Sequence, residues 1–246
     1  MDGFILTQSP YHLVIIIAGY LLAIKLGSIL MKNRQPFELK QVLVYYNYSQ
    51  IFFNVYLLLT VLPVSHKTSM FCRPDDDQFE GTATTTTLHQ QYVALKLYDF
   101  LDTIFFVLRK KQDQISFLHV YHHILVFGVS WVLLKYFPIG PYPVGPPMLF
   151  FIVNCFVHAV MYTYYLKSAR QRVKNLLWKK YVTLLQLVQH YVMLFLSINA
   201  LTSGSCPYPK GLVLVAVVGF FSMVYLFSQF YYRAYVRKNG KPTCKD

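Results

Sequence analysis

The sequence has few charged side chains and few cysteines. Charged residues make up 13% of the 246 residues, about half the share usual in soluble proteins, while hydrophobic residues make up 55%. Disordered chains are rich in charge and poor in aromatic residues, so an aromatic content of 17% excludes that class. Four cysteines are too few for a disulfide scaffold. The remaining class is an integral membrane protein with several membrane spans.

Long apolar segments dominate the chain. Seven of them are long enough, or nearly so, to cross a hydrocarbon core of roughly 30 Å. They lie at about 11–30, 42–64, 92–108, 115–134, 144–166, 181–199 and 212–232. We therefore predict an all-α integral membrane protein whose seven transmembrane helices form a single domain over residues 1–246. The third segment is the weakest candidate, because it carries Lys96, Asp99 and Asp102.

Acidic residues are also scarce, with 10 Asp and Glu against 23 Lys and Arg. A basic chain can bind nucleic acid, but cytosolic loops of membrane proteins also collect Lys and Arg. Seventeen of the 23 basic residues fall in the loops at 31–41, 109–111 and 167–180 and in the tail after 232. This asymmetry predicts a lumenal or external N-terminus and a cytosolic C-terminus, and it explains the charge without nucleic acid. The alternative is a basic cytosolic face that also attracts an anionic ligand.

The two longer loops on the opposite side of the membrane each contain one cysteine, Cys72 and Cys206. Both would face an oxidising lumen, which favours a disulfide between them over two free thiols. The threonine tract at 84–87 lies beside the first of these loops and indicates a solvated lumenal segment.

Ionisable side chains inside the third segment are functional candidates. Burying one charge in the middle of a membrane costs on the order of 3 kcal/mol or more, so such residues are rarely incidental. Lys96 and Asp99 lie one helical turn apart and can neutralise each other. Asp102 has no evident partner in its own helix, except for a histidine from the fourth segment.

Three histidines lie on one helical face of the fourth segment. His119, His122 and His123 are spaced i, i+3 and i+4, which brings their imidazoles within one turn. A lone histidine in a span is more often a packed core residue, but three on one face favour a reactive site.

The fifth and sixth segments carry stripes of polar and aromatic side chains. Such stripes can line a cavity, although Tyr and Met at helical spacing also occur in ordinary packing and membrane amides often only join helices. The stripes consist of Asn154, His158, Met161, Tyr162 and Tyr165 in the fifth segment and Thr183, Gln186, Gln189 and His190 in the sixth.

Two kinds of enzyme chemistry use a histidine cluster of this kind. Imidazoles at this spacing can chelate iron or zinc, as in a membrane metal oxidase that desaturates or hydroxylates its substrate. The set is thin for two irons, because three of the eight histidines lie at or beyond the lumenal ends of the segments. Alternatively, a neutral imidazole can attack a thioester, expel the thiol and hold the acyl group. A seven-span receptor or transporter would share the topology without needing the cluster.

Four motifs resemble those of the fatty-acid elongases of the very-long-chain pathway, the condensing enzymes of the endoplasmic reticulum. The histidines of the fourth segment form the family's HxxHH box. The family's KxxExxDTxFFxLRKK is met by KLYDFLDTIFFVLRKK at 96–111. Its NxxVHxxMYxYY is met by NCFVHAVMYTYY at 154–165, and its TxxQxxQ by TLLQLVQ at 183–189. The chain departs from the family at Asp99, where Glu is usual, and at His190, where Phe is usual.

The resemblance implies a fold and a reaction. Spans two to seven would ring a narrow acyl tunnel, with span one outside, in a multi-pass protein of the endoplasmic reticulum membrane. The reaction would be that of a very-long-chain 3-oxoacyl-CoA synthase. A long-chain acyl-CoA is condensed with malonyl-CoA, CO₂ is lost, and a 3-ketoacyl-CoA two carbons longer results. The resemblance implies no metal and no cofactor besides these substrates.

The expected partners are the two CoA thioesters, membrane lipid and the other enzymes of the elongation cycle. Those enzymes are a ketoacyl reductase, a dehydratase and an enoyl reductase, and they carry the nicotinamide chemistry. A homo-oligomer or hetero-oligomer is compatible with this role, and no nucleic acid is expected.

The resemblance and the spacing together suggest roles for the catalytic residues. We expect His122 to be the nucleophile that forms an acyl-imidazole, and His158 to orient or stabilise the reacting carbon. His119 and His123 would tune protonation, with Asp102 as a partner.

The remaining polar residues are expected to bind the substrates. Side-chain amides would donate hydrogen bonds to the enolate or oxyanion, and the basic residues after the third segment would meet the CoA phosphates. The expected substrate-binding residues are Lys96, Asp99, Asn154, Met161, Tyr162, Tyr165, Thr183, Gln186, Gln189, Arg109, Lys110 and Lys111.

Overall fold

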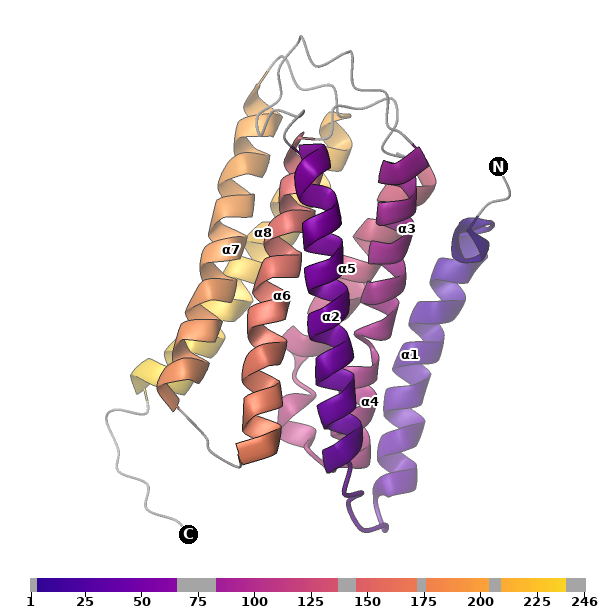
Figure 1. Cartoon of the computed structure of the whole chain (residues 1–246), viewed down its shortest axis with the longest axis vertical. Coiled ribbons are helices and arrows are strands. Elements are labelled where there is room, and N and C mark those ends of the chain that lie inside the picture. Colours follow the sequence, from indigo (N-terminus) through magenta and orange to yellow (C-terminus); the bar gives the residue numbers. More distant parts are fainter. Residues whose placement is uncertain (1–3, 66–82, 137–144, 172–175, 204–208, 238–246) are drawn as a thin grey trace.

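The computed structural model describes residues 4–65, 83–136, 145–171, 176–203 and 209–237. Within these ranges the chain is helical and contains no strand, which confirms the all-α class. The long helices run side by side along the longest axis of the molecule (Figure 1).

Eight α-helices make up most of the described chain. They are α1 (Pro10–Met31), α2 (Lys40–Ser65), α3 (Ala83–Tyr98), α4 (Leu101–Leu108), α5 (Phe117–Tyr136), α6 (Gly145–Gln171), α7 (Leu176–Thr202) and α8 (Lys210–Tyr231). A π-helix at Tyr232–Val236 continues α8, and short 3-10 turns lie at Ile5–Thr7 and Gln112–Gln114. Apart from the third segment, the predicted spans agree with these helices to within about five residues at each end.

Helix α1 shows how local sequence sets a helix start. Ser9 precedes it, and Pro10 occupies its first position, where a missing N–H costs nothing. The Ser9 hydroxyl accepts from the Tyr11 amide at 3.4 Å, and the Ser9 amide donates to Nδ1 of His12 at 3.2 Å. These two bonds satisfy donors that a helix start would otherwise leave free.

Five helices of the described ranges are long and apolar enough to cross a membrane, namely α1, α5, α6, α7 and α8. The protein is therefore a multi-pass membrane protein. Helix α2 has 26 residues and runs the height of the bundle, and α3 with α4 together do the same (Figure 1). The total of seven spans stays a prediction.

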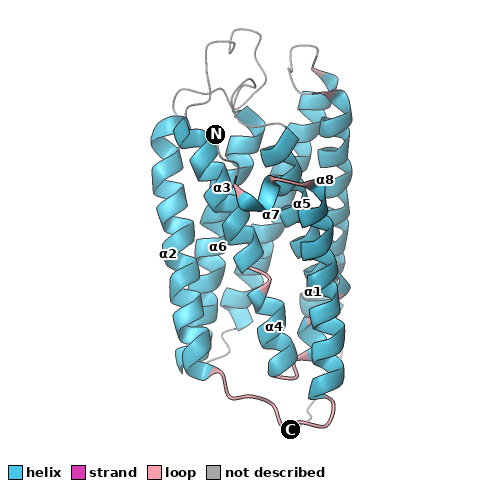
Figure 2. Ribbon diagram, turned by 90° about the vertical axis from the view of Figure 1, so that its right-hand side faces the viewer, coloured by secondary structure: helices cyan, strands magenta, loops and turns pink. Residues whose placement is uncertain are grey.

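Six parts of the chain form a closed ring of helices. Helix α2 packs on α6, α6 on α7, α7 on α8, α8 on α5, α5 on α3, and α3 on α2. Helix α1 lies outside this ring and packs mainly against α4 (Figure 2). Only 6% of the most apolar stretch of α1 is buried in the protein, which fits a helix that faces lipid on most sides. The predicted position of span one outside the ring is confirmed, while an acyl tunnel through the ring stays a prediction.

The third predicted segment differs most from the structure. Helix α3 begins at Ala83 and includes the threonine tract at 84–87, so the solvated loop predicted there is wrong. Thr85 is buried in the bundle, and packing overrides the weak helix propensity of threonine. The helix also ends at Tyr98 and restarts as α4 at Leu101. At this break the amides of Phe100, Asp102 and Thr103 each donate to the carbonyl three residues earlier, which tightens the turn.

The basic loops lie next to one end of the bundle. The C-terminal ends of α1, α4, α6 and α8 and the N-terminal ends of α2, α5 and α7 all lie toward the lower end of Figure 1. Two of the loops touch there, because Nζ of Lys110 donates to the Lys32 carbonyl at 3.0 Å. The side of the membrane that this end faces stays a prediction. Cys72 and Cys206 lie outside the described residues, so their disulfide stays a prediction too.

Candidate active site

Side chains from four helices of the ring meet around His122 of α5. Its ring centroid lies 6.4 Å from that of His158 on α6 and 6.1 Å from that of His190 on α7. The ring of Phe227 on α8 lies 6.3 Å away, nearly perpendicular to it. The Nδ1 atom of His122 is buried and has no hydrogen-bond partner in the described part of the chain. A buried polar atom left unpaired is rare in folded proteins and marks a place where a ligand can bind.

The other two histidines of α5 lie beside His122, as the helical spacing predicts. The ring centroids of His119 and His123 are 4.3 Å apart, and that of His123 is 5.8 Å from that of His122. Nε2 of His119 lies 2.9 Å from Oγ1 of Thr103 on α4. The cluster therefore extends from His122 toward the α3–α4 break.

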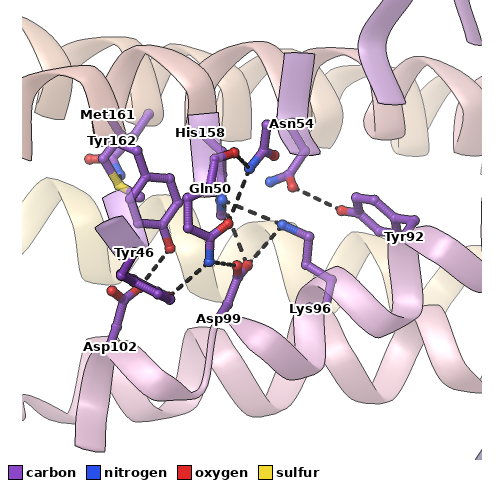
Figure 3. Close-up of polar contacts among 12 residues, drawn as sticks. Tyr46, Gln50, Asn54, Tyr92, Lys96, Asp99, Asp102, His158, Met161 and Tyr162 are labelled. Carbon is purple, nitrogen blue, oxygen red and sulfur yellow. Dashed lines mark hydrogen bonds and ion pairs between the residues drawn. The ribbon is translucent and has the colours of Figure 1, made fainter. Parts of the chain in front are cut away.

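Asp102 does not pair with a histidine of α5, and that prediction is wrong. Its carboxylate accepts a hydrogen bond from the Tyr162 hydroxyl on α6 at 2.7 Å (Figure 3). Adjacent residues of a helix point about 100° apart, so Thr103 faces α5 while Asp102 faces α6. Tyr162 is thereby fixed in the site through its hydroxyl.

A buried ion pair holds His158. Nζ of Lys96 donates to Oδ2 of Asp99 at 3.0 Å, which confirms the pairing expected from their spacing. Nδ1 of His158 lies 3.4 Å from Lys96 Nζ and 3.7 Å from Asp99 Oδ2 (Figure 3). The Lys96 ammonium therefore donates to this ring nitrogen of His158, while the Asp99 carboxylate lies beyond hydrogen-bond distance from it.

Helix α2 contributes a group of polar residues that the sequence reasoning missed. Nε2 of Gln50 donates to Oδ1 of Asp99 and to the Tyr46 hydroxyl, each at 2.8 Å. Asn54 donates to the Gln50 carbonyl at 2.8 Å (Figure 3). Tyr46, Gln50 and Asn54 are all buried, and their i, i+4, i+8 spacing on one face of α2 was the available signal.

Asn154 of α6 presents a free donor inside the ring. Its Oδ1 accepts from the Tyr92 hydroxyl on α3 at 2.9 Å. Its Nδ2 is buried and has no partner among the described residues. The Tyr92 bond thus fixes which end of the amide is left for a ligand. Tyr92 is a second residue that sequence reasoning missed.

The residues predicted on α7 divide between two places. Nε2 of Gln186 donates to the Met161 sulfur at 3.2 Å, next to the histidine cluster, and Gln189 is buried. The Thr183 hydroxyl donates to the Lys179 carbonyl at 3.0 Å and lies 3.2 Å from the Tyr235 hydroxyl on the π-helix. Thr183 therefore belongs to a contact near the basic end of the bundle.

His190 lies inside the cluster, although it was not predicted as a site residue. Its Nδ1 donates to the Gln186 carbonyl at 2.6 Å, and its ring stacks on Phe227 with centroids 4.9 Å apart. Both contacts fix its ring next to His122.

Other predicted binding residues lie away from the histidines. Tyr165 contacts Tyr162 with ring centroids 5.9 Å apart but is 39% exposed. Arg109, Lys110 and Lys111 follow the end of α4, at the basic end of the bundle. The structure therefore does not bring these three basic residues into the cluster.

A metal centre would need several ligand side chains placed around one point. Across the residues that the structure describes, no group of three or more His, Cys, Asp or Glu side chains could hold a metal ion. The recorded polar contacts of the clustered histidines are with the Thr103 hydroxyl, the Gln186 carbonyl and the Lys96–Asp99 pair.

Comparison with known proteins identifies relatives along almost the whole chain. The model of the GNS1/SUR4 family matches residues 5–243. The chain is 36% identical to very long chain fatty acid elongase 2 of Mus musculus, over 99% of this chain and 82% of that protein. It is 35% identical to very long chain fatty acid elongase 4 of Mus musculus, over 98% of this chain and 77% of that protein. It is also 35% identical to very long chain fatty acid elongase 7 of Drosophila melanogaster, over 96% and 72% respectively.

Proposed function

We propose a reaction for this chain from the premise that it belongs to the GNS1/SUR4 family and acts in fatty acid elongation. In the proposed reaction, a long-chain acyl-CoA and malonyl-CoA give a 3-ketoacyl-CoA two carbons longer, with release of CoA and CO₂. The proposed setting is the membrane of the endoplasmic reticulum, with the basic end of the bundle in the cytosol. The other enzymes of the cycle would take up the product there.

The observation that carries the proposal is the environment of His122. Its Nδ1 is buried and unpaired in the described part of the chain, and the rings of His158 and His190 flank it. A neutral imidazole is a good nucleophile toward thioesters, and a buried one keeps its lone pair free of water. His122 therefore suits covalent catalysis better than a structural role.

The first step is transfer of the acyl group to His122. A ring nitrogen of His122 attacks the thioester carbonyl, the carbon–sulfur bond breaks, and an acyl-imidazole forms. The ring proton that His122 loses passes to the departing thiolate, so CoA leaves as the thiol. His158 flanks His122 from α6. Because the Lys96 ammonium donates to its Nδ1, the proton of the neutral His158 ring sits on Nε2 and can be donated to the thioester oxygen.

The second step is condensation. Malonyl-CoA loses CO₂, and the resulting enolate carbon attacks the acyl carbon. The bond from that carbon to His122 breaks, and the imidazole takes up one proton. The free Nδ2 of Asn154 can donate to the enolate or oxyanion oxygen, an interaction worth about 10²–10³ in rate. Exclusion of water matters throughout, because an acyl-imidazole hydrolyses readily.

The test is the intact mass of purified protein after incubation with acyl-CoAs of several lengths, without malonyl-CoA. We expect a mass gain of one acyl group, absent in His122→Gln and retained in His12→Gln, whose histidine lies at the far end of α1. Isotope-labelled malonyl-CoA should then discharge the adduct into a labelled 3-ketoacyl-CoA. An adduct of equal yield in His122→Gln would overturn the assignment of the nucleophile. An adduct that malonyl-CoA does not discharge would overturn the condensation.

A further inference from the structure

One side chain of the peripheral helix α1 reaches into the wall of the ring. Tyr20 is 5% exposed, whereas most of α1 faces outward. Its hydroxyl oxygen lies 2.7 Å from Oγ1 of Thr103, which in turn lies 2.9 Å from Nε2 of His119. Three groups on α1, α4 and α5 thus form a continuous hydrogen-bonded chain that ends on the histidine cluster.

The direction of these hydrogen bonds follows from which groups can donate. In the described part of the chain, Thr103 is the hydrogen-bond partner of the Tyr20 hydroxyl, and a buried hydroxyl that does not donate costs about 1–3 kcal/mol. Tyr20 therefore donates to Thr103, and the Thr103 proton remains for Nε2 of His119. Nε2 of a neutral His119 then accepts, and its ring proton must sit on Nδ1. The opposite direction would leave one buried hydroxyl proton without an acceptor.

A second contact joins Tyr20 to the cluster through aromatic rings. Tyr20 stacks on Phe100, the residue at the α3–α4 break, with ring centroids 4.1 Å apart. Phe100 in turn packs edge-on against His123, with centroids 6.1 Å apart. Tyr20 thus supports His119 through its hydroxyl and His123 through its ring.

These contacts continue to the proposed nucleophile. The rings of His119 and His123 are 4.3 Å apart, and that of His123 is 5.8 Å from that of His122 and perpendicular to it. A rotation of His119 would displace His123, and a displaced His123 would change the orientation of His122.

We propose that Tyr20 is a positioning residue for the reaction, and that its hydroxyl fixes the tautomer and orientation of His119. The effect on turnover rests on the proposed function, but the effect on the tautomer does not. Helix α1 thereby has a role in the site although it lies outside the ring. Tyr20 itself does not contact the substrate in this scheme.

The experiment compares Tyr20→Phe with Tyr121→Phe in the full-length protein. Tyr20→Phe removes the hydroxyl and keeps the stacked ring. Tyr121→Phe is a matched control, because it removes a hydroxyl that bonds between helices at 2.8 Å, to Ser222, without touching a histidine. Thr103→Val and Thr103→Ser form a second pair that removes or keeps the middle hydroxyl without altering Tyr20.

Two readouts separate positioning from stability. Nitrogen-15 NMR of histidine-labelled protein, with His119 assigned by its loss in His119→Asn, reports which ring nitrogen carries the proton. We expect the proton on Nδ1 in the parent, Tyr121→Phe and Thr103→Ser, and a mixture of tautomers in Tyr20→Phe and Thr103→Val. Turnover of acyl-CoA with malonyl-CoA should fall on the order of 10-fold in the last two variants, with KM for acyl-CoA unchanged.

The inference is overturned if His119 keeps one tautomer in Tyr20→Phe, or if the rate of Tyr20→Phe equals that of Tyr121→Phe. The NMR readout needs no substrate, so it decides the tautomer claim even if no acyl adduct forms on the parent protein. Absence of that adduct in the parent would instead count against the proposed function.

Discussion

At the scale of the residue, Asn154 depends on one hydroxyl for its orientation. The Tyr92 hydroxyl occupies the amide oxygen, which leaves the amide nitrogen as the free donor. Asn154→Asp keeps the shape but replaces this donor by an acceptor that would repel an enolate. We expect the condensation rate to fall about 10²–10³-fold, as after loss of an oxyanion donor. The measurement is kcat for the 3-ketoacyl product with saturating malonyl-CoA.

Tyr92→Phe provides the comparison for this prediction. Without the hydroxyl the amide can turn over, so the rate should fall less than in Asn154→Asp. Tyr225→Phe is the control, because Tyr225 is 57% exposed on the outer face of α8. A full rate in Asn154→Asp would remove Asn154 from the mechanism.

The pair of Lys96 and Asp99 leads to a stability prediction. Both side chains are buried, at 3% and 4% exposed. Lys96→Met leaves the Asp99 carboxylate without its cation, and removing one partner of a buried pair costs about 3–5 kcal/mol. We expect a large fall in Tm in detergent, and a smaller fall in the double variant Lys96→Met/Asp99→Asn. Lys25→Met on the outer face of α1 is the control and should leave Tm nearly unchanged. If the fall in Tm of the double variant equalled the sum of the falls of the two single variants, Lys96 and Asp99 would not be coupled.

The sequence predicted the residues of the site better than their partners. Spacing within one helix is enough to group His119, His122 and His123, because helical geometry alone brings them together. The bond from Gln50 to Asp99 depends on how α2 packs on α3, which no spacing within a segment reveals. The predicted partner of Asp102, a histidine, was wrong for the same reason, because a correct prediction required knowing which helix each face of α4 contacts.

At the scale of the element, the α3–α4 break was the main feature that the sequence did not predict. Hydropathy averages over a segment. The polar start of α3 at 83–91 was therefore left out of the predicted span at 92–108, and the tight turn at 99–100 inside that span gave no signal. The break has a function in the fold, because it lets Asp99 face α2 and α6 while Phe100 faces α1 and α5.

The contact of α1 with α4 depends on a glycine. A Cβ added at Gly27 would lie 2.9 Å from Cγ1 of Val107, a β-branched side chain that has little rotamer freedom in a helix. Gly27→Ala should therefore push α1 away from α4 and destabilise the fold by about 1–3 kcal/mol, as overpacking does. A Cβ at Gly19 would meet nothing within 4 Å, so Gly19→Ala is the matched control.

The measurement for this contact is Tm in detergent for Gly27→Ala, Gly19→Ala, Val107→Ala and the double variant Gly27→Ala/Val107→Ala. Gly27→Ala creates a clash with Val107, and Val107→Ala removes the atom that causes it. Val107→Ala should thus lower Tm less when it is added to Gly27→Ala than when it is made in the parent. Equal values of Tm for the two single glycine variants would show that α1 does not pack closely at Gly27.

At the scale of the whole molecule, the sequence and its family resemblance predicted the all-α membrane class and the ring of helices. The orientation of that ring in the membrane is the next prediction to test. The basic loops adjoin one end of the bundle, next to the ends of α1, α4, α6 and α8 (Figure 1). Lys and Arg are retained on the cytosolic side during insertion, so this end should face the cytosol. Glycosylation acceptor tags at either terminus measure the orientation in microsomes.

We expect a glycosidase-sensitive mass increase with the N-terminal tag and none with the C-terminal tag. The untagged chain serves as the control. It has an acceptor sequence of its own, Asn47-Tyr48-Ser49, but we expect no glycosylation there, because the sequence lies within α2 and Asn47 is 5% exposed. Glycosylation of the C-terminal tag would show that the bundle has the opposite orientation in the membrane. The basic end would then face the lumen, where no cytosolic CoA thioester could reach it, and the proposed route of the substrates would fail together with the orientation.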